Sequence, residues 1–202
     1  MSGAPRFALP GTWGRIDLAS EATTQRSIRR LVERTTGRDD ALSTLRAELR
    51  ARFNTAATLA RENGAVDFHI AMELAPGVPL PAWLAVFLPA IAEERLEELG
   101  LTDLRAALDF GVAATAPSNA GVTTIAKNRV QAVRQAFHRV TPETDEQPAT
   151  ELLQVDYWLA AGNPNRIALL TFTTQLVEHE TQMLELFDAI IGTVRWPAPV
   201  AP

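Results

Sequence analysis

Residues 153–173 read LQVDYWLAAGNPNRIALLTFT, and this stretch decides the fold class. Every second residue from 153 to 159 is apolar or aromatic, and a turn sequence of glycine, asparagine and proline follows at 162–165. Such alternation is typical of a strand with one buried face, and these turn residues favour a reversal of the chain. We therefore predict an antiparallel hairpin whose return strand covers residues 167–173.

A segment with helical periodicity follows the hairpin. Over residues 177–194, apolar side chains recur at intervals of three and four, which places them on one face of a helix. We predict a closing helix that packs this face on the sheet. The face consists of Met183, Leu186, Phe187, Ile190 and Ile191.

Two further helices are predicted in the first third of the chain. The first covers residues 21–36 and follows an N-cap at Ser20. The second follows an N-cap at Asp39 or Asp40 and ends at Gly64. We expect an apolar stripe of the second helix to face the core. The stripe is Leu42, Leu45, Leu49, Phe53, Ala56 and Leu59.

The middle of the chain is less uniform. Residues 66–74 alternate apolar and polar side chains and are predicted to form a strand. Residues 80–88 are a continuous apolar run, compatible with a buried strand or a buried helix. Residues 129–140 have helical spacing, yet they lead into the strand of the hairpin, so both interpretations stay open. One or two short helices are expected at 90–108, and a loop at 111–121.

Composition excludes several classes of function. The 202 residues suit a single domain over 1–202 with a proline-rich tail at 196–202. A net charge of −5 disfavours binding to nucleic acid or to an anionic membrane. The absence of cysteine excludes disulfides and thiolate metal sites. No apolar run is long enough to span a bilayer, so we expect a soluble, cytoplasmic protein. Nucleotide-binding glycine motifs and hydrolase motifs are also missing, and no cofactor is expected.

Two stretches carry a resemblance to a known superfamily. They are FALPGTWGRIDL at 7–18 and VDYWLAAGNPNRIALLTFTTQLVEHETQMLELFDAIIGTVRW at 155–196. Together they resemble the Mog1/PsbP-like superfamily, in particular uncharacterised actinobacterial members. The resemblance implies an α+β fold in which helices pack an antiparallel sheet, with strands at 80–88 and 129–139. It carries no catalytic motif, because the superfamily has no shared active site.

The resemblance therefore implies a non-enzymatic protein-interaction or assembly module with a protein partner. A place beside an actinobacterial type VII-like secretion system rests on the resemblance alone. The alternative is a small-ligand or lipid-binding domain that uses a cleft between the second helix and the sheet. Its motivation is the apolar run at 80–88. An enzyme is the third and least favoured interpretation.

The histidines define the candidate chemical sites. His69 shares a strand face with Asp67 and Glu73, a weak candidate for a metal site or a carboxylate-oriented base. A solvated strand face is the favoured interpretation, and no metal site is predicted. His138 could join His69 if their strands were neighbours, and is otherwise an ordinary surface residue. Three consecutive residues, Glu178, His179 and Glu180, point in different directions on a helix and cannot chelate one ion.

Arginine and tryptophan supply the candidate partner-binding residues. A basic cluster on the first predicted helix contains Arg29, Arg30 and Arg34, which could meet an acidic partner, although a solvated helix face is the favoured interpretation. Trp83 and Trp158 are the aromatic candidates, because indole rings are enriched at interface hot spots. We expect these five residues to form the partner-binding surface.

Overall fold

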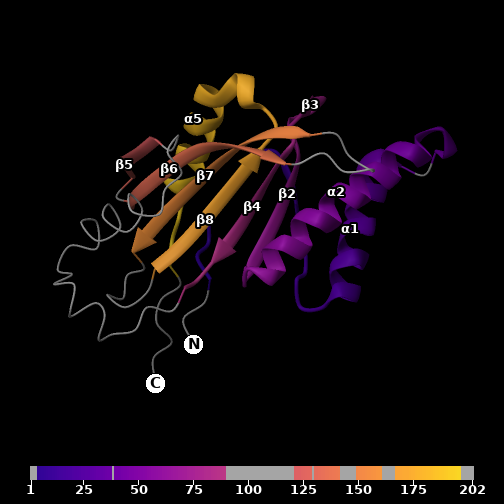
Figure 1. Ribbon diagram of the computed structural model, residues 1–202, viewed down its shortest axis with the longest axis horizontal. Coiled ribbons are helices and arrows are strands. Elements are labelled where there is room, and N and C mark those ends of the chain that lie inside the picture. Colours follow the sequence, from indigo (N-terminus) through magenta and orange to yellow (C-terminus); the bar gives the residue numbers. More distant parts are fainter. Residues whose placement is uncertain are drawn as a thin grey trace. The chain divides into compact units, whose positions relative to one another are not determined.

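The computed structural model describes residues 4–37, 39–89, 121–128, 130–141, 149–160 and 167–196 (Figure 1). The chain divides into two compact units. The first unit is Pro10–Phe87, and the second is Met1–Leu9 together with Leu88–Pro202. The helices expected at 90–108, the turn at 162–165 and most of the loop at 111–121 and of the proline-rich tail lie outside the described residues. The single domain expected over 1–202 stays a prediction.

Antiparallel strands and two helices build the first unit. Strand β2 (Asp67–Ala75) pairs with β1 (Thr12–Arg15), with the short β3 (Val78–Pro79) and with β4 (Ala82–Phe87). The predicted strand at 66–74 is therefore confirmed. The apolar run at 80–88 is a strand, as the resemblance implied, and its side chains are packed: Leu80, Ala82, Leu84, Ala85 and Val86 are buried.

Helix α1 (Glu21–Thr36) has the predicted bounds. Its N-cap, Ser20, accepts a hydrogen bond at Oγ from the Thr23 backbone N–H at 3.2 Å, and the Thr23 hydroxyl accepts one from the Ser20 N–H at 3.0 Å. This reciprocal pair satisfies two backbone donors at the helix start. The helix ends at Gly37, whose φ of 70° lies in the region that favours glycine.

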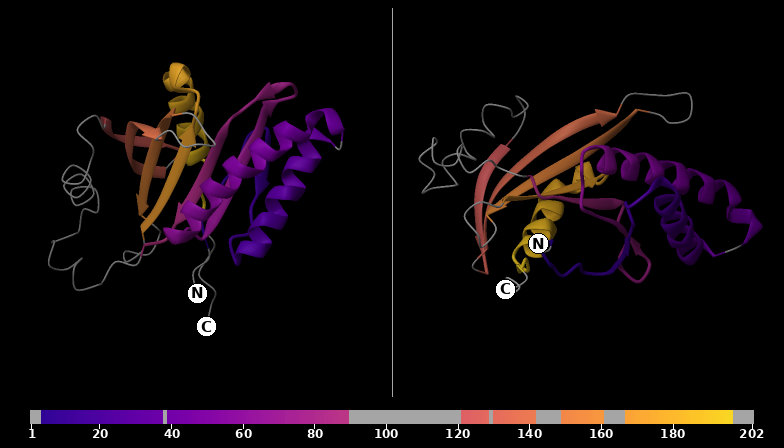
Figure 2. Two further views of the ribbon diagram at one scale, coloured as in Figure 1. Left: turned by 45° about the vertical axis from the view of Figure 1, so that its right-hand side comes forward. Right: turned by 90° about the horizontal axis from the view of Figure 1, so that it is seen from below.

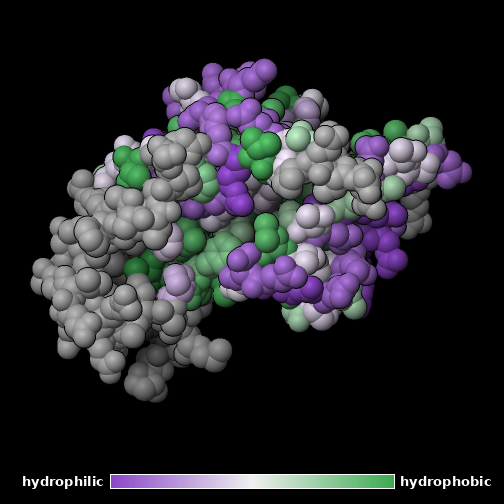
Figure 3. Space-filling model, in the orientation of Figure 1, coloured by the Kyte–Doolittle hydropathy of each residue, from purple (hydrophilic) through white to green (hydrophobic). Residues whose placement is uncertain are grey.

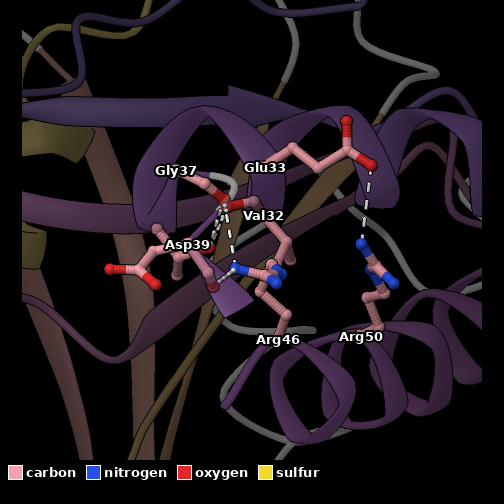
Figure 4. A network of polar contacts seen from close by, with 7 residues as sticks. Val32, Glu33, Gly37, Asp39, Arg46 and Arg50 are labelled. Atoms are coloured by element: carbon pink, nitrogen blue, oxygen red, sulfur yellow. Dashed lines mark hydrogen bonds and ion pairs between the residues drawn. The ribbon is translucent and has the colours of Figure 1, made fainter. Parts of the chain in front are cut away.

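An arginine-rich corner joins α1 to the second helix (Figure 4). A 3₁₀ turn (Asp40–Leu42) precedes α2 (Ser43–Glu62), and Asp39 caps that turn by accepting from the Ala41 N–H at 3.0 Å. Arg46 donates from Nη1 to the Asp39 carbonyl at 2.6 Å. Arg50 Nη2 lies 3.5 Å from Glu33 Oε1. Arg50 therefore links α2 to α1, and Arg46 links α2 to the connection between the two helices.

The predicted apolar stripe of α2 is only partly buried. Leu45 and Leu59 are 43% and 53% exposed, and the buried positions are Ala57 and Ala60. Two alanines bring the helix backbone close to the core, which turns the larger leucines at the edge of the stripe outward. The expectation that the whole stripe faces the core is wrong. The buried core cluster of this unit is Ile16, Ile28, Leu31, Val32, Ala57, Ala60, Phe68, Ile70 and Ala85.

In the part that the structure describes, the second unit is a meander of four antiparallel strands with one α-helix. Its strands are β5 (Gly121–Lys127), β6 (Val130–Thr141), β7 (Thr150–Ala160) and β8 (Ile167–Thr174), each paired with the next. The β7–β8 hairpin is confirmed. The contested segment at 129–140 is the strand β6, as the resemblance implied. Strand β5 was not predicted.

The closing helix covers one face of this meander (Figure 2). A 3₁₀ turn (Val177–His179) leads into α5 (Glu180–Ile191), which buries Met183, Phe187, Ile190 and Ile191. The Phe187 ring stacks on Phe172 of β8 with centroids 4.4 Å apart. Tyr157 of β7 meets Phe172 edge-on at 5.7 Å. The fold is thus α+β with antiparallel strands, as predicted.

Candidate functional site

The two histidines singled out in the sequence lie in different units, and each contacts carboxylates of its own unit. His69 stands on β2 of the first unit, whereas His138 stands on β6 of the second. Each imidazole is therefore oriented by its own acidic partners.

In the first unit, Asp67 is held between a histidine and an arginine. His69 Nε2 lies 3.2 Å from Asp67 Oδ2, and Arg15 Nε donates to Asp67 Oδ1 at 2.7 Å. The side chains of Asp67 and His69 are each 13% exposed. The expectation of a solvated face is therefore wrong for these two residues. Glu73 lies further along β2, opposite Thr12, and does not complete the group.

The charge state of Asp67 follows from this arrangement. Burial alone would raise the pKa of its carboxyl, but the hydrogen bonds from His69 and Arg15 outweigh burial and lower the pKa to about 2. The carboxylate thus stays ionised throughout the neutral range. A cavity of about 550 Å³ adjoins it, with Arg15, Asp17, Ser27 and Asp67 among its lining residues.

We expect Asp67→Asn to destabilise the fold by about 1 to 2 kcal/mol at pH 6. A carboxyl whose pKa is lowered on folding stabilises the protein above its unfolded pKa, near 3.8, and loses that contribution as the pH falls to about 2. Urea unfolding of both proteins between pH 6 and pH 2 should show their stabilities converging. A gap that stays constant over this range would contradict the role of the ionised carboxylate.

In the second unit, His138 lies between two carboxylates from two other elements. Its Nδ1 is 3.0 Å from Glu151 Oε1 on β7, and its Nε2 is 2.9 Å from Glu180 Oε2, the first residue of α5. The hydrogen bond to Glu180 raises the pKa of His138, partial burial opposes this, and Glu151 raises it further. His138 is therefore more than an ordinary surface residue.

A cavity of about 740 Å³ lies beside this histidine. The charged or titratable side chains that line it are Arg134, His138, Glu151 and Glu180. Apolar contacts are supplied by Val122, Phe137, Val140 and Leu184. The cavity thus brings together the end of β6, the beginning of β5 and the first turn of α5.

A second polar network links the second half of α5 to the sheet. Asp188 accepts hydrogen bonds from the Tyr157 hydroxyl and from Arg134 Nη1, each at 2.7 Å. Tyr157 is fully buried, and burial together with the adjacent carboxylate raises its pKa. The phenol thus stays neutral and serves as a fixed donor. Sequence reasoning missed Arg134, Glu151, Tyr157 and Asp188 as polar partners, and it explained Glu180 only as part of the helix start.

The polar contacts of both histidines are ion pairs with carboxylates of the same unit. Within the residues that the structure describes, no group of three or more His, Asp or Glu side chains is placed to hold a metal ion. Nε2 of His69 faces one carboxylate, whereas both ring nitrogens of His138 face carboxylates. Each cluster can fix a charge and respond to protons, which is the function that its geometry supports.

The predicted partner-binding residues are divided between the two units. Arg29, Arg30 and Arg34 are exposed on α1 of the first unit. Trp83 is half-buried on β4, where it packs against the core of that unit. Trp158 is half-buried on β7 of the second unit. The arginines are thus available to a partner, whereas much of each indole is already in contact with its own unit.

Comparisons of the chain with family models and with curated proteins gave no match. Among the described residues, no helix has both the length and the apolar character needed to cross a membrane.

Proposed function

We propose that this protein is a non-enzymatic protein-interaction module, and that it docks through the outer face of α1. The docking surface consists of Arg26, Arg30 and Arg34, which we call the arginine row, with Arg29 beside it. The observation that carries the proposal is that these exposed guanidinium groups form no ion pair within the described part of the chain.

The spacing of the arginine row aligns its charges. Residues four apart lie above one another on a helix, so Arg26, Arg30 and Arg34 span about 12 Å along the axis. Two acidic residues lie on the same helix: Glu33 is 3.5 Å from Arg50, and Glu21 accepts a hydrogen bond from Gln25 at 3.1 Å. Hydrophilic side chains cover much of α1 and α2 in the space-filling view (Figure 3).

Such a row is unfavourable for the isolated fold. Like charges at i and i+4 destabilise a helix by about 0.2 to 0.5 kcal/mol per pair. A surface that costs stability and satisfies no contact within its own unit is best explained by a partner. Guanidinium groups bind carboxylates with paired hydrogen bonds, so the partner that fits is a protein with an acidic surface. A place beside a type VII-like secretion system stays part of the proposal on the resemblance alone.

The small-ligand or lipid-binding alternative has less support. Its motivation was a surplus of apolar side chains at 80–88, but that segment is packed in the core of the first unit. Neither of the two cavities described above is lined by it. The tryptophans are also left out of the docking surface, because both are half-buried.

A glutamate-rich peptide with a fluorescent label is a suitable first probe. We expect it to bind the wild type in low salt, to dissociate as salt is added, and to bind Arg30→Glu/Arg34→Glu at least tenfold more weakly. The matched control is Arg6→Glu/Arg52→Glu, which makes the same charge change at two other exposed positions. Equal loss of binding in the control would contradict a specific surface on α1.

The single variant Arg30→Glu separates function from folding. Glutamate at position 30 would lie four residues from both Arg26 and Arg34, so the stability of α1 should stay within a few tenths of a kcal/mol of the wild type. Urea unfolding measures this. If the variant binds weakly and is also destabilised, Arg30 supports the fold. In a separate test, tighter binding of duplex DNA than of the peptide would contradict an acidic protein partner.

A further inference from the structure

We propose that His138 is a proton-operated clamp, which ties the first turn of α5 to β6 and β7 when the imidazole is charged and releases it when the proton is lost. The clamp consists of His138, Glu151 and Glu180. It concerns the second unit alone and is independent of the docking surface proposed on α1.

The geometry requires a charged imidazole. Both ring nitrogens lie within 3.0 Å of a carboxylate oxygen, Nδ1 facing Glu151 and Nε2 facing Glu180. A protonated imidazole has two N–H donors and can satisfy both carboxylates at once. A neutral imidazole has one donor and one lone pair, so one carboxylate then faces a lone pair and is repelled. Loss of one proton therefore breaks one of the two links.

The charged groups that face His138 come from three described elements. Glu151 extends from β7, Glu180 from α5, and Arg134 lies four residues away on the same strand. Arg134 is already paired with Asp188 at 2.7 Å, so its charge is locally balanced. The residues of β5 that line the adjacent cavity, 121–123, carry no charge. Among these groups, only Glu151 and Glu180 lie within hydrogen-bonding distance of the imidazole.

The rest of α5 is fixed independently of the histidine. Phe187, Ile190 and Ile191 are buried, and Asp188 is bound by Tyr157 and Arg134. The start of the helix contributes Glu180 and the half-buried Leu184, which both line the cavity of about 740 Å³, and the buried Met183 lies between them in the sequence. Release of His138 would thus loosen the first turn over the cavity and leave the second half of the helix docked.

The sign of the pH dependence follows from the carboxylates. Because the folded protein favours the charged imidazole, the clamp is closed below the ordinary pKa of histidine and opens as the pH rises through the elevated pKa of His138. The histidine is then the group that changes charge.

Amide hydrogen exchange of the full chain, followed by NMR from pH 5.5 to pH 8.5, tests the clamp. After correction for the intrinsic exchange rate, we expect protection of amides 183–185 to fall severalfold as the pH rises, while amides 188–191 keep theirs. In His138→Gln, the first turn should be weakly protected at every pH. The matched control His179→Gln changes an exposed histidine beside α5 and should behave like the wild type.

Two results would overturn the proposal. One is wild-type protection of amides 183–185 that does not change with pH. The other is the same pH-dependent fall in His138→Gln. A second variant, Glu180→Gln, keeps the helix start but removes the charge, so it should lower the pKa of His138 and abolish the pH dependence of protection. If Glu180→Gln leaves both unchanged, the clamp is likewise excluded, even where His138→Gln folds poorly.

Discussion

Replacement of Phe187 by alanine is expected to lower the free energy of unfolding by about 3 to 5 kcal/mol. The Phe187 side chain is fully buried on α5 and stacks on Phe172 with an interplanar angle of 17°. Alanine would lose this contact and leave a cavity between the helix and β8.

Urea denaturation with far-UV circular dichroism measures the effect. Leu186→Ala provides the comparison, because Leu186 lies on the same helix but is only half-buried, and it should cost clearly less. An unchanged midpoint for Phe187→Ala would show that α5 is not docked on the sheet as described.

The second large effect is expected at Asp188. Substitution by alanine should destabilise the protein by about 2 to 4 kcal/mol, because it leaves the buried Tyr157 hydroxyl and the charge of Arg134 without their shared acceptor. The side chains of Arg134 and Asp188 are 18% and 20% exposed, so water can offset part of the loss. The cost should therefore stay below that of a fully buried ion pair.

Two further substitutions separate charge from hydrogen bonding. Asp188→Asn keeps one oxygen acceptor and should cost less than Asp188→Ala. Glu185→Ala removes an exposed carboxylate from the same helix and should change stability by no more than about 0.5 kcal/mol. Thermal unfolding of the three variants ranks them. Equal stability of Asp188→Ala and Glu185→Ala would contradict the network.

The sequence predicted those helices and strands that are determined by residues close together in the chain. Ser20 and Thr23 form the capping box of α1 within four residues, and the β7–β8 hairpin follows from alternation around one turn. Residues 80–88 and 129–140 lacked a decisive period. Only the resemblance indicates strands there. A strand that is buried on both faces shows no alternation of apolar and polar residues.

On α2, tertiary packing and not the apolar sequence pattern decides which face of the helix is buried. The apolar stripe through Leu45 and Leu59 suggested which face is buried, yet Ala57 and Ala60 make the closest approach. Small residues on β1 act in the same way: a Cβ at Gly14 would overlap the Leu31 side chain, so α1 packs directly on that strand. Such steric fits depend on pairs far apart in sequence, which periodicity does not reveal.

The candidate clusters were harder to predict for the same reason. His138 and Glu180 are 42 residues apart, and Tyr157 and Asp188 are 31 apart. Arg134 and His138 are four residues apart and would share a face on a strand or on a helix, but their acidic partners come from other elements. The Asp67 and His69 pair was visible as an alternation on one strand, but its burial was not.

Site-specific photo-cross-linking in the organism that produces the protein tests the docking surface on α1 most directly. A photoreactive residue at Ala22, an exposed position next to Arg26 and Arg29 on the helix, should form a cross-link to an acidic protein. The yield should fall when Arg30→Glu/Arg34→Glu is introduced and persist with Arg6→Glu/Arg52→Glu. The same residue at Thr55, exposed on α2, should give little product. Equal cross-linking from both positions, or a product that is insensitive to the arginine row, would contradict the proposed function.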